Sequence, residues 1–462
     1  MVLASKTSYA QPSFSEPDGG GEGQTTFQEH NCLSPEKRLN SLQVTDSITK
    51  TLSNRAFFKN RRNAPSFSWP VAQAAGFSNN NIYAISNFVD HDPASGSLLD
   101  YNCGQRTYDL TSGYNHKGLD IYLWPFKWHM VNEDQAIAVA ADDGLINWKV
   151  DGNPHTNCDF SNPTWNAVYL IHADGSRSWY GHLKNGSLTS KNIGDFVSKG
   201  EYLGVIASSG SSTGPHLHFE VYDSLNQLVD PYSGSCNSMN TNSWWDNQPD
   251  YFEPRINTLY THFAPPQFNT CPTPAVKNDT TCFSPGVTAY FAAYFRDQRS
   301  SISASYRIKN PNGVTFSSWS HNSPQDYTSS YWYWSRNIPN NAIEGQWTFE
   351  VRMLTDTVIH YFDVSSNCSQ VTSSESISML DDQIQTYPNP SNGFFHLKLP
   401  TNTSDNYDIQ MIDALGRDII FTAEKTNSSK QINLHVPSYT SGIYFMIVKT
   451  KQAVYQTSIY LK

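Results

Sequence analysis

The chain has 462 residues, of which 16% are charged and 13% are aromatic, and its formal net charge is −10. This length suits roughly two to four domains. The low charged fraction excludes a long disordered polyelectrolyte, and the negative charge gives no general attraction to nucleic acid or anionic membranes. Because no apolar stretch approaches the ~18 residues that span a bilayer, we predict no transmembrane segment.

We predict a largely irregular leader or pro-segment over residues 1–65, which are mostly polar and contain a run of glycines. Ser8-Tyr9-Ala10 is similar to the small-residue end of a signal cleavage site. The basic cluster Lys59, Arg61 and Arg62 suits an exposed, protease-accessible junction. An ordinary flexible tail and a solvated linker are the alternative interpretations.

Between residues 66 and 235, short apolar runs alternate with turn dipeptides. One Asp-Gly turn separates the run 137–141 from the run 145–150, and another separates 167–171 from 177–182. Asp-Gly between two such runs is a hairpin signal. We therefore predict an antiparallel β-sheet domain over residues 66–235.

The remainder of the chain is also predicted to be mostly β. A Trp- and Asn-rich connector at 236–262 leads to alternating strands at 263–370 that are typical of a β-sandwich, here an accessory domain. A Ser-rich linker at 371–382 precedes a small C-terminal β-sandwich at 383–462. The aromatic string 331–334 could bind sugar rings or a partner, although aromatic residues that alternate on strands are more often core.

Two local patterns of histidine have spacings that suit metal chemistry. His116 and Asp120 precede an apolar run, and His216, His218 and Glu220 share one face of a predicted strand. Alternate residues on a strand lie ~6.6 Å apart, so two such imidazoles can reach one ion. With a carboxylate and a His from the first pattern, a three-ligand site with an open fourth position becomes possible, as a catalytic zinc requires. A pair of surface or partly buried histidines is the alternative interpretation.

A family resemblance rests on three motifs in chain order. These are His116-Lys117-Gly118-Leu119-Asp120, then Tyr180-Gly181-His182, and then Gly210-Ser211-Ser212-Thr213-Gly214-Pro215-His216-Leu217-His218-Phe219-Glu220. Together they resemble the lysostaphin and β-lytic metallopeptidase family of zinc endopeptidases. The resemblance covers roughly residues 67–235.

The resemblance implies a role for each motif histidine. It implies that His116, Asp120 and His218 bind one Zn²⁺ per catalytic domain, whereas His182 and His216 are catalytic histidines that do not ligate the metal. The division between His216 and His218 follows from the resemblance, because spacing alone leaves it open. An activated water would be the nucleophile at neutral pH.

The function implied is that of a secreted endopeptidase that hydrolyses peptide bonds in bacterial cell-wall peptidoglycan by attack of a zinc-activated water. One alternative is cleavage of Gly-rich extracellular proteins such as elastin, which some family members attack. Another alternative is a non-catalytic cell-wall-binding or adhesion protein. The chain retains all five motif positions, which argues against this second alternative.

The C-terminal segment has its own resemblance. The sequence Tyr387-Pro388-Asn389-Pro390 is followed by Asp413 to Arg417 and then by Gly442-Ile443-Tyr444. This set resembles the C-terminal sorting domain of the type IX secretion system. It implies that the secretion machinery is a partner and that the protein is secreted or displayed at the cell surface.

Seven dispersed cysteines favour an oxidising, extracytoplasmic compartment. Cys103 and Cys158 fall in one predicted domain, so we predict that they form a disulfide. Cys271 and Cys282 are close enough in sequence to close a second loop. Since seven is odd, one thiol is unpaired, pairs with another chain, or is removed with the leader through Cys32.

Overall fold

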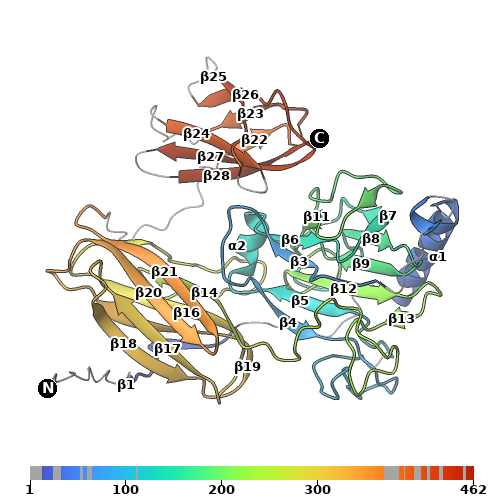
Figure 1. Ribbon diagram of the computed structural model, residues 1–462, viewed down its shortest axis with the longest axis horizontal. Coiled ribbons are helices and arrows are strands. Elements are labelled where there is room, and N and C mark those ends of the chain that lie inside the picture. Colours follow the sequence, from blue (N-terminus) through green and yellow to red (C-terminus); the bar gives the residue numbers. More distant parts are fainter. Residues whose placement is uncertain are drawn as a thin grey trace, which may run out of the picture.

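The computed structural model forms three β-rich domains in chain order, with one long helix at the edge of the first (Figure 1). We call residues 65–253 the first domain, residues 255–368 the second and residues 384–462 the third. No helix among the described residues has the length and apolar composition of a membrane span. The described residues are 13–23, 33–52, 56–59, 65–110, 113–368, 384–389, 391–399, 407–413, 417–425, 430–450 and 454–462.

The first domain is built on an eight-stranded sheet in the order β10-β7-β8-β9-β12-β5-β4, with β13 paired to β12. Every pairing in this sheet is antiparallel, which confirms the predicted sheet type. A three-stranded sheet, β11-β6-β3, and the short helix α2 complete the domain. The bounds are β3 Val71–Gln73, β4 Tyr83–Asn87, β5 Leu119–Leu123, α2 Lys127–Asn132, β6 Ala136–Val139, β7 Gly144–Val150, β8 Ala167–Ile171, β9 Arg177–Gly181, β10 Phe196–Val197, β11 Tyr202–Val205, β12 His216–Tyr222 and β13 Leu228–Val229.

Of the two hairpins that the Asp-Gly turns predict, one is confirmed and one is wrong. β8 and β9 pair directly across the turn at Asp174-Gly175. The turn at Asp143-Gly144 instead carries the chain from one sheet to the other, because β6 pairs with β3 and β11 whereas β7 pairs with β8 and β10. The dipeptide sets the local turn, but it does not select the partner strand.

The second domain is a sandwich of a six-stranded sheet, β1-β18-β17-β20-β21-β15, and a four-stranded sheet, β14-β16-β19-β2. β14 begins at Arg255, so the sandwich starts inside the range assigned to the connector. Trp245 from the same range lies in the core of the first domain. The bounds are β1 Ser13–Phe14, β2 Gly19–Glu22, β14 Arg255–His262, β15 Cys282–Phe283, β16 Thr288–Gln298, β17 Ser303–Lys309, β18 Thr315–Asn322, β19 Tyr327–Asn337, β20 Gly345–Met353 and β21 Asp356–Val364.

The aromatic string at 331–334 is part of this packing. Trp332 and Trp334 lie in the sandwich core. Tyr331 packs instead against Phe268 and Trp124, in an aromatic cluster that joins the first two domains. These contacts support the interpretation of the string as core.

The third domain places two small sheets, β22-β23-β26-β25 and β24-β27-β28, around one apolar core. The predicted linker at 371–382 lies outside the described residues. The bounds are β22 Gln385–Tyr387, β23 Phe394–Lys398, β24 Tyr407–Asp413, β25 Thr422–Lys425, β26 Gln431–His435, β27 Gly442–Thr450 and β28 Val454–Leu461.

The N-terminal segment is not largely irregular, which corrects that prediction. An 18-residue helix, α1, spans Pro35–Leu52 beside the first domain (Figure 1), and a short 3₁₀ turn follows at Ala56–Lys59. The helix begins with a typical signal, because the Ser34 hydroxyl accepts from the Lys37 amide and Pro35 occupies the first turn. Strands β1 and β2 pair with β18 and β19 of the second domain. Ser8-Tyr9-Ala10, Arg61, Arg62 and Cys32 lie outside the described residues.

A buried ion pair attaches α1 to the main sheet. The Arg38 guanidinium contacts the Glu220 carboxylate on β12 and lies 3.2 Å from the Tyr222 hydroxyl. The side chain of Arg38 is 8% exposed and that of Glu220 is 0% exposed. Each charge therefore depends on the other for compensation.

The predicted pairing of Cys103 with Cys158 is wrong. Three disulfides link Cys103 to Cys236, Cys158 to Cys271, and Cys282 to Cys368, so Cys271 and Cys282 do not close a loop of their own. The first two bonds cross the predicted boundary at residue 235, and a prediction that paired cysteines within that boundary could not find them. The Cys158–Cys271 bond ties a loop of the first domain to the segment between β14 and β15 of the second.

Non-reducing peptide mapping of the full chain, purified without reductant, is expected to recover Cys103 joined to Cys236 and Cys158 joined to Cys271. Peptides that join Cys103 to Cys158 would contradict the structure. The same digest after reduction gives the matched control, because all of these linked peptides must separate.

Replacing Arg38 is expected to destabilise the chain through Glu220. Arg38→Met leaves a buried carboxylate without its counter-charge, which is expected to lower the free energy of unfolding by about 3–5 kcal/mol in urea titrations. Arg38→Met combined with Glu220→Gln should recover part of the loss. Lys37→Met is the control, since Lys37 lies on the same helix and its ammonium donates to the Thr164 hydroxyl of the first domain instead of a buried carboxylate. Equal effects of Arg38→Met and Lys37→Met would contradict the proposed coupling.

Candidate active site

Strand β12 carries the site on one of its faces. Leu217, Phe219 and Val221 are fully buried in the core of the first domain, as the alternation predicts. His216 and His218 therefore project from the opposite face. This face belongs to the centre of the sheet, between β9 and β5.

Strand register brings the other motif residues to this face. His218 lies opposite Asp120 of β5 and opposite Gly181 of β9, which directly precedes His182. The backbone of His182 adopts a φ of 64°, a left-handed conformation that few non-glycine residues adopt. Three segments far apart in the chain thus meet at one point.

Three potential ligands converge beside Asp120. His116 Nε2 lies 3.1 Å from one carboxylate oxygen of Asp120, and His218 Nδ1 lies 2.8 Å from the other. One ligand atom from each residue lies within 4.8 Å of those of the other two. Atoms that bind one tetrahedral zinc at ~2.0–2.2 Å lie roughly 3.3 Å apart, so the arrangement fits such an ion.

The second nitrogen of each of these imidazoles has a partner that orients the ring. His116 Nδ1 lies 2.7 Å from the Phe88 carbonyl oxygen, which can only accept, so the proton is on Nδ1 and the lone pair on Nε2. His218 Nε2 lies 3.0 Å from the Glu220 carboxylate, which favours the proton on Nε2 and the lone pair on Nδ1. Carboxylate and carbonyl partners of this kind are typical of metal-ligating histidines.

His182 and His216 stand together next to this cluster. Their ring centroids are 4.2 Å apart, and His216 Nε2 lies 3.7 Å from Asp120 Oδ1. His182 Nδ1 donates to the Ser209 carbonyl at 2.5 Å, and His216 Nδ1 donates to the Gly214 carbonyl at 2.8 Å. Both rings therefore carry their lone pair on Nε2.

The carboxylates at the site are ionised. Burial raises the pKa of the Asp120 carboxyl, but the neighbouring histidines, His116 first, outweigh burial and hold this pKa well below its ordinary value. Burial also acts to raise the pKa of Glu220, but Arg38 and then His218 lower it to about 2. The centre of the sheet therefore presents negative charge to a cation.

The site is enclosed by aromatic rings and by a close approach of the backbone. The Tyr108 ring stacks on His116 at 4.5 Å, and the Trp165 ring lies 5.2 Å from that of His182. At Gly118 an added Cβ would lie 2.6 Å from His218 Nε2, so only glycine fits this position. The residues His116, His182 and His218 are 0% exposed.

All five residues predicted as ligands or catalytic groups lie together, although the division of roles between them remains a prediction. The sequence analysis gave no role to Glu220 or Arg38. Glu220 follows His218 by two residues and lies on the same face of the strand. This spacing could have indicated that Glu220 contacts the His218 imidazole. No local pattern points to Arg38, which reaches the site from a helix 182 residues away in the sequence.

Two segments of the chain match known families. Residues 127–231 match the model described as Peptidase family M23, and residues 385–462 match the model described as Secretion system C-terminal sorting domain. The first match includes His182, His216 and His218, and it begins after His116 and Asp120. The second match covers most of the third domain.

Curated relatives share part of the first domain. Lysostaphin of Staphylococcus simulans is 39% identical over 71 residues, which are 15% of this chain and 13% of that protein. The glycyl-glycine endopeptidase ALE-1 of Staphylococcus capitis is 34% identical over 152 residues, which are 30% of this chain and 36% of that protein. The chain spans 12% to 36% of the length of the curated relatives it matches.

Among solved structures, the catalytic domain of lysostaphin from Staphylococcus simulans is 27% identical, with a TM-score of 0.20. That alignment covers 27% of this chain and 83% of the lysostaphin domain.

The matches to the two family models identify the first and third domains of the chain. The chain carries a peptidase family M23 domain and a C-terminal secretion sorting domain, and it is a secreted or cell-surface protein.

Proposed function

We propose that the chain is a zinc-dependent endopeptidase that hydrolyses peptide bonds in bacterial cell-wall peptidoglycan outside the cell. The observation that carries this proposal is the convergence of His116 Nε2, the Asp120 carboxylate and His218 Nδ1 beside two further histidines. The M23 match supports a peptidase. The name of the relative ALE-1 supports glycyl-glycine bonds as the ones cut.

His116, Asp120 and His218 would hold the zinc ion. Two imidazoles and a carboxylate are a common donor set for a catalytic zinc with three protein ligands. The contacts of Phe88 O and Glu220 behind the rings keep the ligand nitrogens deprotonated. When bound, Zn²⁺ supplies a Lewis acid that lowers the pKa of water toward about 7.

His216 and His182 would move protons at their Nε2 atoms. Each ring donates from Nδ1 to a backbone carbonyl, so its Nε2 can accept a proton from the nucleophilic water. The imidazolium that results can return the proton to the leaving amine or stabilise the developing oxyanion. The burial of His182 beside Trp165 shields its ring from bulk water.

A Gly-rich extracellular protein such as elastin is the alternative substrate, and the glycyl-glycine bond in the name of ALE-1 also suits such a protein. A non-catalytic adhesion role is the weaker proposal. It would not require all five motif residues to meet at one point.

Separate substitutions are expected to divide ligands from catalytic groups. His218→Ala should lose both zinc and activity, because it removes a ligand. His182→Ala should keep zinc but lower kcat by at least about 10²-fold, because it removes a proton-transfer group. Metal analysis of the purified variants and release of peptides from purified cell walls measure the two effects. His155→Ala is the control histidine of the same domain, and activity that survives both of the other substitutions would end the peptidase proposal.

Mass spectrometry of released peptides is expected to identify cell-wall cross-links as the substrate. The full chain should solubilise purified peptidoglycan and release fragments with new amino termini at glycine. The same enzyme incubated with elastin is the comparison. Rapid cleavage of elastin with intact peptidoglycan would replace the first substrate with the alternative one.

A further inference from the structure

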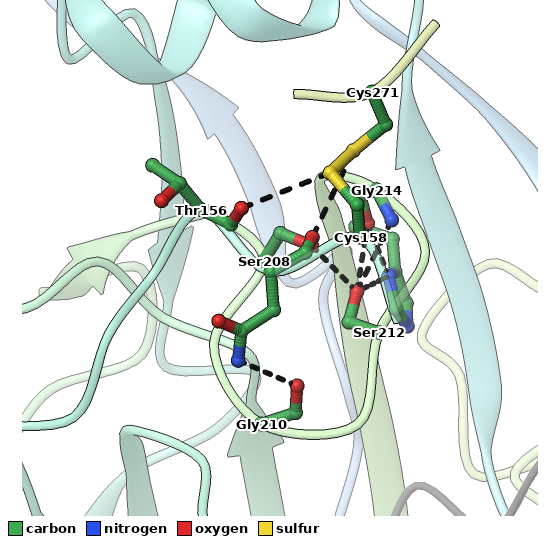
Figure 2. The surroundings of a disulfide bond; sticks show 9 residues. Thr156, Cys158, Ser208, Gly210, Ser212, Gly214 and Cys271 are labelled. Atoms are coloured by element: carbon green, nitrogen blue, oxygen red, sulfur yellow. Dashed lines mark hydrogen bonds between the residues drawn. A yellow bond between two sulfur atoms is a disulfide. The ribbon is translucent and has the colours of Figure 1, made fainter. Parts of the chain in front are cut away.

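A second network lies behind His216, on the side away from Asp120. The loop that leads into β12 places Ser212 beside the Cys158–Cys271 disulfide (Figure 2). The Ser212 hydroxyl oxygen lies 3.3 Å from His216 Nδ1, and Ser212 is 2% exposed. This serine belongs to the motif that carries the family resemblance, but the proposed chemistry gives it no role.

The donors in this network follow from its backbone carbonyls, and the Ser212 hydroxyl can donate either to Ser208 Oγ at 2.8 Å or to the Gly214 carbonyl at 3.0 Å. The Ser208 hydroxyl donates to the Asn157 carbonyl at 2.7 Å, because a carbonyl can only accept. Ser208 Oγ can then accept from the Ser212 hydroxyl. The Ser212 oxygen is left to accept from His216 Nδ1–H, which also donates to the Gly214 carbonyl. The Gly214 carbonyl places the His216 proton on Nδ1, and Ser212 Oγ is a second acceptor on the same side of the ring.

The Cys158–Cys271 disulfide holds the segment around Asn157, where this chain of hydrogen bonds ends. The amide of Ser212 donates to the Asp159 carbonyl at 3.3 Å, and the amide of Asn157 donates to the Ser208 carbonyl at 3.0 Å. Cys158 lies between Asn157 and Asp159 in the sequence and is bonded to Cys271 (Figure 2). The position of Ser212 is therefore tied to the segment between β14 and β15 of the second domain.

We propose that Ser212 is a positioning residue that restrains the ring orientation of His216, and that the Cys158–Cys271 disulfide anchors the segment holding Ser212. This inference rests on the proposed function, in which His216 exchanges a proton at Nε2. Without Ser212, the Gly214 carbonyl alone would restrain the ring. Misplacement of a catalytic group by about 1 Å can cost roughly 10²-fold in rate, so the loss of one restraint on the ring is expected to have a smaller effect of about tenfold.

The test compares variants of the full chain in peptide release from purified cell walls. Ser212→Ala is expected to lower kcat by about tenfold, with zinc content unchanged and KM within about twofold. Ser212→Thr keeps the hydroxyl and should restore most of kcat. The neighbouring Ser211, which is also buried, gives the matched control Ser211→Ala, with expected activity equal to the wild type.

A double variant separates positioning from a general structural effect. If Ser212 acts through His216, adding Ser212→Ala to His216→Ala should cause no further loss. An additional tenfold loss, loss of zinc in Ser212→Ala, or wild-type kcat in Ser212→Ala would overturn the inference. Wild-type protein that releases no peptide would instead defeat the proposed function, so the two failures are distinguishable.

The disulfide is tested with Cys158→Ser combined with Cys271→Ser. This variant is expected to have a lower kcat with little change in KM. It should keep its zinc, because the three proposed ligands lie on other segments. In this background, Ser212→Ala should have a smaller effect than in the wild type. An unchanged effect of Ser212→Ala would overturn the anchoring role of the disulfide.

Discussion

The register of β12 between its two neighbours is the constraint on which the site depends. His218 faces Asp120 on one side and the end of β9 on the other only in this register. A slip of one residue would turn Leu217 and Phe219 toward the site and His218 into the core. Burial of an apolar side chain of this size is worth about 1.5–3 kcal/mol, so the hydrophobic face of the strand also fixes its polar face.

The charges on the polar face of β12 and its neighbours also compensate one another. Asp120 contacts two imidazoles, and Glu220 stands between the imidazole of His218 and the guanidinium of Arg38. Each carboxylate is removed from water, and each has a cationic or hydrogen-bonding partner that offsets this loss. The N-terminal helix therefore belongs to the electrostatics of the site, although the sequence analysis treats its region as a leader.

The sequence was sufficient where the signal is local. The alternation along β12 and the β8–β9 hairpin follow from spacing, and the structure confirms them. The proximity of His116, Asp120 and His218 was implied by the family resemblance, and these residues do lie together. The sequence was insufficient where distant segments choose their partners, as in the disulfides and the pairing of β7. Helix α1 was missed although Ser34 and Pro35 are a recognisable start, because its buried face includes Arg38 and Thr45 and so lacks a clear apolar stripe.

The Cys158–Cys271 bond also has a consequence for how the domains of this chain can recombine in evolution. The peptidase sheet and the sandwich share this bond, an aromatic cluster around Trp124 and Phe126, and the Arg106–Asp297 ion pair. A recombination event that moved the sheet alone would carry an unpaired thiol and an uncovered aromatic surface. The first two domains are therefore expected to be inherited together in evolution. The sorting domain shares no disulfide with them, so recombination can replace it separately.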